Sequence, residues 1–185
     1  MPVEGQVLGG KYRLERLVGS GGFASVWAAR NILLDRLVAL KILNESYARM
    51  PGFLPRFLRE AKLSSRAIHR NIVSVEDIDQ TPEGIVFLVM ELLQGHTLAD
   101  EIKGGQSLTL ERSLEIIEPT LEGLEAAHKL NIIHRDIKPA NIFLTDGTMA
   151  GPRVRILDLG LAKDLVHDDE LTSSDQMVGT PSYLA

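Results

Sequence analysis

The sequence predicts an α+β fold in two parts, an antiparallel β-sheet with one helix followed by a mainly helical part. Short apolar segments with strand-like composition are separated by turn residues over the first half of the chain. Two other segments, 53–66 and 109–130, carry apolar residues at helical spacing. The predicted strands are 12–18, 24–29, 37–43, 72–78, 85–92, 142–144 and 154–157.

The composition restricts the classes of function. The 185-residue chain has a formal charge of -5 and a pI near 5.5, so it lacks the basic surface of a nucleic-acid-binding protein. It contains no cysteine, which excludes disulfides and thiolate zinc sites and fits a cytoplasmic protein. We expect no signal peptide, and no membrane contact within this stretch, because no apolar run approaches the ~20 residues that span a bilayer.

A glycine-rich turn joins the first two predicted strands. Gly19-Ser20-Gly21-Gly22-Phe23 has the composition that lets backbone N–H groups approach a polyphosphate. A strand follows rather than a helix, and no Gly-Lys-Ser/Thr sequence is present, so Rossmann and P-loop sites are excluded. A phosphate-binding loop and a plain hairpin turn both remain open.

Lys41 lies on the predicted strand 37–43, where it shares a face with apolar residues. An ammonium group on such a face is costly unless a carboxylate or a phosphate pairs with it. Glu60 borders the inward stripe of the predicted helix 53–66 and is the candidate partner. The structural alternatives are a lysine that extends from an edge strand and an exposed glutamate.

The long predicted helix begins after Thr109, a favourable N-cap residue, and ends near Leu130. Pro119 lies inside it, and we expect a bend or a break there because proline removes one helical hydrogen bond. Apolar residues spaced three or four apart predict one buried stripe, formed by Leu114, Ile117, Leu121 and Leu124.

Polar side chains with complementary chemistry concentrate in residues 133–141. Asp136 can orient a hydroxyl group and accept its proton, and Lys138 can meet phosphate charge. Asn141 can supply an oxygen ligand to a magnesium ion. Asp158 follows directly after an apolar predicted strand, where its carboxylate can be aimed into a cleft as a second magnesium ligand.

These segments, in this order, resemble the catalytic domain of eukaryotic-like serine/threonine protein kinases of the bacterial type. His134-Arg135-Asp136, with Lys138 and Asn141, resembles the catalytic loop. Asp158-Leu159-Gly160 resembles the Asp-Phe-Gly motif with leucine in the middle. Ala24 departs from the pattern, because it stands where the family usually has a third glycine.

The resemblance implies the two-lobe fold of protein kinases. Residues 1–93 would form the nucleotide-binding N-lobe, and 94–185 the beginning of a mainly helical C-lobe that is truncated within the large lobe. The polar segment from Leu161 to Met177 would be the activation segment, in which a phosphate on Thr172 or Ser174 pairs with Arg135. A solvated loop is the alternative for that segment.

The resemblance also implies ATP and Mg²⁺ as cofactors and assigns the site residues. Catalysis would depend on Asp136, Lys138, Lys41 and Glu60, and magnesium binding on Asn141 and Asp158. Val26, Ala39 and Phe143 would sandwich the adenine, next to the gatekeeper Met90 and the backbones of Glu91 and Leu93. The complete ATP-binding set is Val18, Gly19, Ser20, Gly21, Gly22, Phe23, Val26, Ala39, Lys41, Met90, Glu91, Leu93 and Phe143.

The implied function is ATP-dependent phosphorylation of serine or threonine hydroxyls on proteins in bacterial signalling. The implied location is the cytoplasm, or the cytoplasmic face of a membrane if an anchor follows, and dimerisation of the kinase is a further expectation. Two alternatives remain open. One is a truncated kinase fragment that binds nucleotide or partners without turnover, and the other is a small-molecule kinase of related fold.

Overall fold

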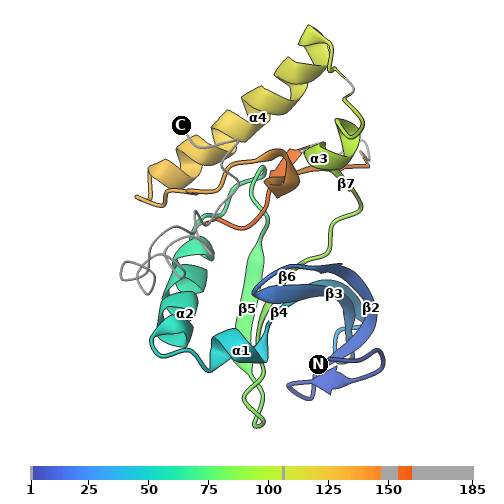
Figure 1. The fold of residues 1–185 in the computed structure, drawn as a ribbon, viewed down its shortest axis with the longest axis vertical. Helices are drawn as coiled ribbons and strands as arrows, with labels where there is room; N and C mark the ends of the chain where they lie inside the picture. Colours follow the sequence, from blue (N-terminus) through green and yellow to red (C-terminus); the bar gives the residue numbers. More distant parts are fainter. Residues whose placement is uncertain (1, 106, 147–153, 160–185) are drawn as a thin grey trace. The chain divides into compact units, whose positions relative to one another are not determined.

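The computed structural model describes residues 2–105, 107–146 and 154–159, which divide into two compact units (Figure 1). The first unit consists of Met1–Ser65 and Ser74–Leu93. The second consists of Arg66–Val73 and Gln94–Ala185, so residues 66–73 group with it although they lie within the first predicted range.

An antiparallel sheet of six strands forms the first unit, in the order β1-β2-β3-β4-β6-β5 (Figure 1). Its central strands β4 and β6 are almost continuously apolar and buried, as expected of strands covered on both faces. The predicted α+β fold with an antiparallel first part is confirmed. The strands are β1 (Val7–Leu8), β2 (Tyr12–Ser20), β3 (Ala24–Asn31), β4 (Arg36–Leu43), β5 (Val75–Gln80) and β6 (Val86–Glu91).

Two helices follow β4 in the first unit, α1 (Glu45–Ala48) and α2 (Phe53–Ser64). The apolar positions that predicted α2 are buried, because Phe53, Phe57 and Ala61 face the interior at helical spacing. The ring of Phe53 also contacts that of Tyr47 on α1, with 5.3 Å between the ring centroids.

The second unit contains a three-stranded sheet, in the order β7-β8-β9, with helical elements (Figure 1). Its helices include α4, which begins after the N-cap Thr109 as predicted, since the Thr109 side chain accepts a hydrogen bond from the backbone N–H of Arg112. The elements are β7 (Gly95–Thr97), α3 (Leu98–Glu101), α4 (Leu110–His128), the 3₁₀ helix η1 (Pro139–Asn141), β8 (Ile142–Thr145) and β9 (Val154–Ile156).

Residues 71–73 extend the sheet of the second unit instead of starting the predicted strand 72–78. Val73 N donates to Ile156 O at 2.9 Å, and Ile156 N donates to Asn71 O at 2.7 Å. The Asn71 side chain adds a bond from Nδ2 to Val154 O at 2.9 Å. Because these backbone groups pair with β9, strand β5 begins only at Val75.

The predicted buried stripe of α4 is wrong. Leu114, Ile117 and Leu121 are 46%, 51% and 58% exposed, and Leu124 is half-buried. The buried residues of this helix are Ile116, Thr120, Gly123 and Ala127. The helix runs through Pro119 without a break.

Apart from Ile116, the buried face of α4 consists of small residues, and at Gly123 the helix approaches its neighbours closely. A Cβ atom on Gly123 would lie 2.7 Å from Ile156 Cδ1 and 3.2 Å from Asn71 O, closer than real contacts allow without a shift. A bulky side chain at position 123 would force the helix away from Ile156 of β9 and from Asn71.

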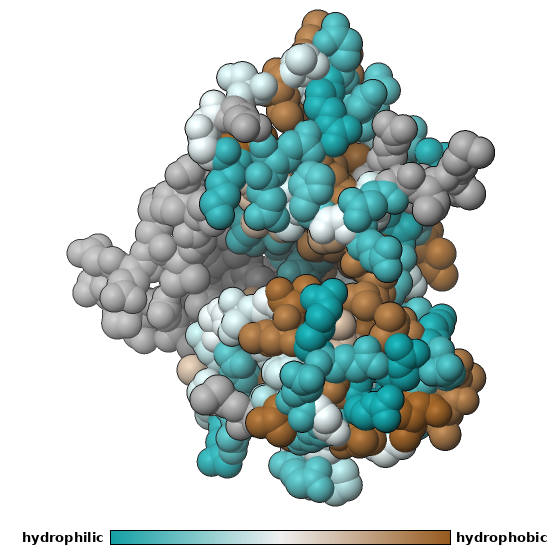
Figure 2. Space-filling model, turned by 90° about the vertical axis from the view of Figure 1, so that its right-hand side faces the viewer, coloured by the Kyte–Doolittle hydropathy of each residue, from teal (hydrophilic) through white to brown (hydrophobic). Residues whose placement is uncertain are grey.

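Apolar side chains also reach the surface of the first unit. At the turn between β3 and β4, Leu33 and Leu34 are 72% and 69% exposed. Figure 2 shows one face of the molecule, on which apolar and hydrophilic surface lie side by side.

Within the described residues, no helix has the length and apolar character needed to cross a membrane.

Candidate active site

The predicted catalytic loop connects α4 to η1 and is organised by a buried histidine. His134 Nε2 bonds to Leu157 O at 2.8 Å, and the backbone N–H of Asp136 donates to His134 Nδ1 at 3.3 Å. Because Nδ1 accepts, the proton lies on Nε2 and the imidazole is neutral. Burial lowers the pKa of His134, which keeps the ring in this form.

Asp136 is held by two of the side chains that the sequence grouped with it. Lys138 Nζ lies 2.7 Å from Asp136 Oδ2. Asn141 Nδ2 donates to Asp136 O at 2.8 Å and to Asp136 Oδ2 at 3.2 Å. The carboxylate is therefore oriented by the carboxamide of the buried Asn141 and the ammonium group of the half-buried Lys138.

Asn141 also joins the loop to the residues that carry Asp158. Leu157 N donates to Asn141 O at 2.9 Å, so the end of β9 is fixed beside η1. Arg135 and Asp158 both adopt positive φ, 63° and 56°, which is unusual for residues with a side chain. Such backbone strain is concentrated at functional sites in proteins.

The residues around Asn141 fit a magnesium ion. Carboxylate and carboxamide oxygens are the protein ligands that Mg²⁺ prefers, and it commonly takes only one or two of them together with phosphate and water. Asn141 uses its Nδ2 group for Asp136, which leaves the carboxamide oxygen as the ligand atom. Asp158 would supply the second oxygen.

In the first unit, the glycine-rich turn comprises the last two residues of β2 and the three residues before β3, and its glycines 19, 21 and 22 are exposed. Gly21 N donates to Ala24 O at 2.9 Å across the turn. The ring of Phe23 lies over the ammonium group of Lys41, with 4.9 Å from Nζ to the ring centroid. Such a contact favours a cation at this position.

Several predicted nucleotide contacts share one face of the first sheet. Val26 pairs with Lys41, and Ala39 pairs with Met90. Since Ala39 and Lys41 are two residues apart on β4, their side chains point to the same side. Lys41 is only 4% exposed, so its ammonium group is almost completely removed from water.

The remaining predicted residues are distributed as follows. Glu60 lies on α2, but its side chain is outside the described part of the chain, so its ion pair with Lys41 stays a prediction.

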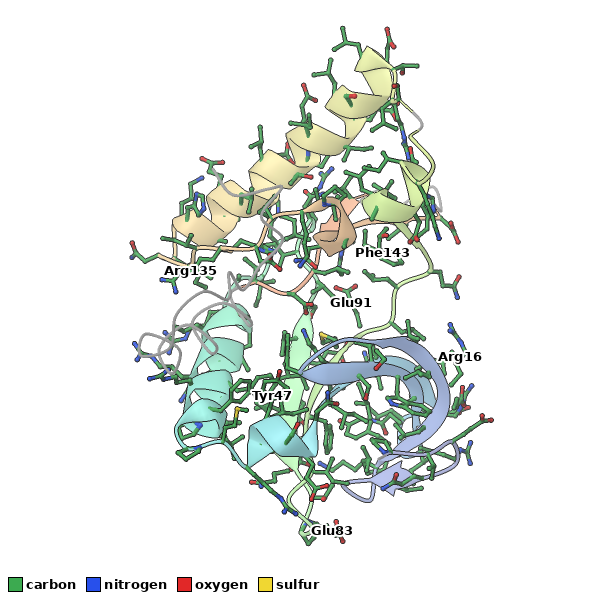
Figure 3. All side chains as sticks on the ribbon, in the orientation of Figure 1. Arg16, Tyr47, Glu83, Glu91, Arg135 and Phe143 are labelled. Carbon is green, nitrogen blue, oxygen red and sulfur yellow. The ribbon has the colours of Figure 1, made fainter. Side chains whose placement is uncertain are left out.

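Glu91 ends β6, where its backbone N–H bonds to Ser74 O at 3.2 Å. The half-buried Phe143 on β8 belongs to the second unit, as does Arg135 in the loop before it (Figure 3). Val18 is exposed, Leu93 is half-buried, and Thr172 and Ser174 lie outside the described residues.

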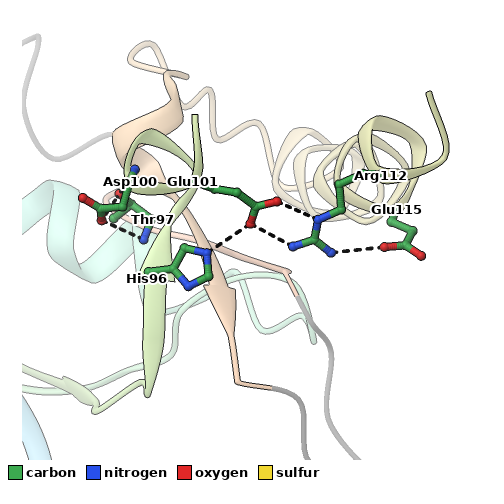
Figure 4. A network of polar contacts seen from close by, with 6 residues as sticks. All are labelled: His96, Thr97, Asp100, Glu101, Arg112 and Glu115. Carbon is green, nitrogen blue, oxygen red and sulfur yellow. Dashed lines mark hydrogen bonds and ion pairs between the residues drawn. The ribbon is translucent and has the colours of Figure 1, made fainter. Parts of the chain in front are cut away.

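A polar network outside the loop connects α3 to α4 (Figure 4). Arg112 binds the carboxylate of Glu101 with two nitrogens, at 2.8 and 2.9 Å, and His96 Nε2 lies 3.0 Å from the same carboxylate. The hydrogen bond from Arg112 lowers the pKa of Glu101 to about 2. These contacts join β7, α3 and α4 to one another, so we assign the network a structural role in holding α3 to α4.

Two residues that organise the site, His134 and Asn71, had no predicted role of their own. His134 was part of the segment that suggested the site, and its position two residues before Asp136 was the available signal. Asn71 has a backbone and side-chain role that depends on contacts with β9, and no local pattern indicates such contacts.

Comparison with known proteins decides the family. Residues 12–185 match the model of the protein kinase domain. The chain belongs to the protein kinase family.

The kinase chain is also similar to bacterial serine/threonine kinases. It is 37% identical to the serine/threonine-protein kinase PknA of Mycobacterium tuberculosis, over 100% of this chain and 42% of that protein. It is 36% identical to the serine/threonine-protein kinase PrkC of Bacillus subtilis, over 98% of this chain and 27% of that protein. The kinase chain therefore spans less than half the length of these curated relatives.

A solved structure gives the same fold. The kinase domain of PknI from Mycobacterium tuberculosis aligns with a TM-score of 0.75 at 26% identity, over 88% of this chain and 64% of that one. The predicted two-lobe protein-kinase fold, with an antiparallel β N-lobe, is thereby confirmed.

Proposed function

We propose that this chain is part of a catalytic domain that transfers the terminal phosphoryl group of ATP to serine or threonine hydroxyls of proteins, in bacterial signalling. The observation that carries the proposal is the orientation of the Asp136 carboxylate by Asn141 Nδ2 and Lys138 Nζ. A carboxylate held in this way can accept a hydrogen bond from an incoming hydroxyl and then take its proton.

The other residues have complementary roles in this proposal. Lys138 offsets negative charge on the transferred phosphoryl group, which it can reach because it already lies beside the carboxylate. Lys41 and the N–H groups of the glycine-rich turn bind the phosphates of ATP. Asn141 and Asp158 hold Mg²⁺, which neutralises phosphate charge when it is bound.

Phosphorylation with the Asp136→Asn variant tests the proposal. Asparagine keeps the size of the side chain but cannot accept the hydroxyl proton, so transfer to a casein-like protein should fall at least ~100-fold. ATP binding, measured by calorimetry, should change less than ~3-fold, since the phosphates are bound by other residues.

Asp146→Asn is the matched control, because Asp146 is an exposed aspartate of the same unit, and its activity should equal that of the wild type. If the Asp136→Asn variant were as active as the wild type, the assignment of Asp136 as the base would be contradicted. ATP binding by the wild type without any transfer would instead support the alternative of a fragment that binds nucleotide without turnover.

Two finer expectations belong to the same proposal. Phosphate on Thr172 or Ser174 would pair with Arg135, and mass spectrometry of active protein without phosphate at either residue would contradict it. Dimerisation of the kinase domain remains a prediction.

A further inference from the structure

The tip of the glycine-rich turn is held by a residue from outside the turn. Asn44, the first residue after β4, donates from Nδ2 to Gly22 O at 2.7 Å and from its backbone N to Phe23 O at 2.8 Å. Gly22 is exposed and has no side chain, so the peptide groups on either side of it depend on such bonds for a fixed orientation.

The side chain of Asn44 gives up its usual role to make this contact. Asn44 is the N-cap of α1 and has an extended backbone, but its side chain makes no capping hydrogen bond to that helix. An N-cap asparagine normally accepts a bond through its oxygen. Here the nitrogen acts as a donor to Gly22 instead, and aspartate, an equally good cap, has no such donor.

The two hydrogen bonds determine where the next two N–H groups point. A trans peptide group is planar, with its C=O and N–H directed to opposite sides. Holding the carbonyls of Gly22 and Phe23 toward Asn44 therefore directs the N–H groups of Phe23 and Ala24 away from it. Successive N–H groups held in a fixed direction are the donors that a polyphosphate requires.

The same contacts connect the turn to the strand of Lys41. Asn44 follows β4 directly, and the Phe23 ring lies 4.9 Å from Lys41 Nζ. A movement of the turn away from Asn44 would separate its N–H groups from the ammonium group with which they would share the phosphates.

We propose that Asn44 is a positioning residue for phosphate binding, which holds the N–H groups of Phe23 and Ala24 ready for the polyphosphate of a nucleotide. The proposal rests on the proposed function, because it requires that the glycine-rich turn binds ATP. It assigns no contact between Asn44 and the nucleotide itself.

Calorimetric titration of the full chain with ATP plus Mg²⁺, and separately with adenosine, tests this role. Asn44→Ala removes the donor, so ATP should bind about 3- to 10-fold more weakly, the loss of one neutral hydrogen bond. Adenosine has no phosphates, and its affinity should change less than ~2-fold. A general loss of structure would weaken both ligands and lower the melting temperature of the nucleotide-free chain.

Asn44→Asp separates positioning from helix capping, because aspartate keeps the shape and is an equally favourable N-cap residue but has no donor. Its added charge is controlled by Ser46→Asp, which places a carboxylate at an exposed position two residues later. We expect Asn44→Asp to weaken ATP binding at least 3-fold more than Ser46→Asp does.

Two results would overturn the inference. One is that Asn44→Ala binds ATP as tightly as the wild type does, and Asn44→Asp as tightly as Ser46→Asp does. The other is that Asn44→Ala weakens the binding of ATP and of adenosine equally. A wild-type chain that binds no ATP would overturn the proposed function together with it.

Discussion

His134 shows how one side chain can position two others that carry the chemistry. Its Nδ1 accepts from the backbone of Asp136, while its Nε2–H donates to Leu157, the residue before Asp158. The contact with Asp136 requires the neutral imidazole, because a second proton on Nδ1 would face an N–H donor. The position of the candidate base thus depends on the protonation state of His134, and the same ring also bonds to the residue before the candidate magnesium ligand.

Stability should therefore fall in mild acid. Burial lowers the pKa of His134 below its ordinary value of 6.5, so the unfolded chain binds this proton at a higher pH than the folded chain does. The free energy of unfolding should be constant with respect to this group above pH 6.5. It should decrease as the pH falls below 6.5, by up to ~1.4 kcal/mol per pH unit, until the lowered pKa is reached.

Urea unfolding of the wild type and His134→Gln at pH 7.5 and 5.5 measures this effect. Glutamine offers a donor and an acceptor that do not titrate, so the variant should lose less stability between the two pH values. Equal losses in the two proteins would contradict the assignment to His134.

The site could be predicted from the sequence where chemistry limits the choice of residue. Asp136, Lys138 and Asn141 were found because proton transfer, phosphate charge and magnesium binding each accept few side chains. His134, Asn71 and Asn44 were missed in these roles because what they do depends on which backbone carbonyl or N–H group lies opposite. That partner is set by the fold, and no spacing along the chain reports it.

Among the elements, α4 shows why its existence was predicted and its orientation was not. Apolar residues at helical spacing and the Thr109 cap are local signals, and they located both ends within two residues. The face was chosen by hydropathy, which favours leucine over glycine and alanine. Close approach to β9 reverses that preference at position 123, where even a Cβ atom would lie 2.7 Å from Ile156 Cδ1.

Gly123→Ala should therefore destabilise the chain although alanine is the better helix former by ~1 kcal/mol. The new methyl group would press on Asn71 O and Ile156 Cδ1, so we expect the free energy of unfolding to fall by about 1–3 kcal/mol. Glu122→Ala, at the exposed neighbouring position, should change it by less than ~0.5 kcal/mol. A more stable Gly123→Ala variant would show that the helix has room at this position.

For the molecule as a whole, the outward face of α4 is an apolar surface. Leu110, Leu114, Ile117 and Leu121 are spaced four, three and four residues apart, and all are exposed. Contiguous apolar surface of this kind favours association in water. The side chains gain little from folding, because they remain in contact with solvent.

Replacing Leu114 and Leu121 together by glutamine should leave the free energy of unfolding of this chain within ~1 kcal/mol of the wild type. Self-association, measured by sedimentation, should decrease. Ile116→Ala is the matched control from the buried face of the same helix, and it should cost about 2–5 kcal/mol. If the double glutamine variant were as unstable as Ile116→Ala, the residues of the predicted stripe would be buried after all.

Residues 66–73 also determine how the chain can be divided. The polypeptide leaves the first unit after Ser65, returns at Ser74 and leaves again after Leu93. A single cut after Leu93 would give a C-terminal piece without Asn71, whose backbone and side chain bond to β9 just before Asp158. The two units are thus interleaved along the gene, and recombination at one junction would exchange neither of them intact.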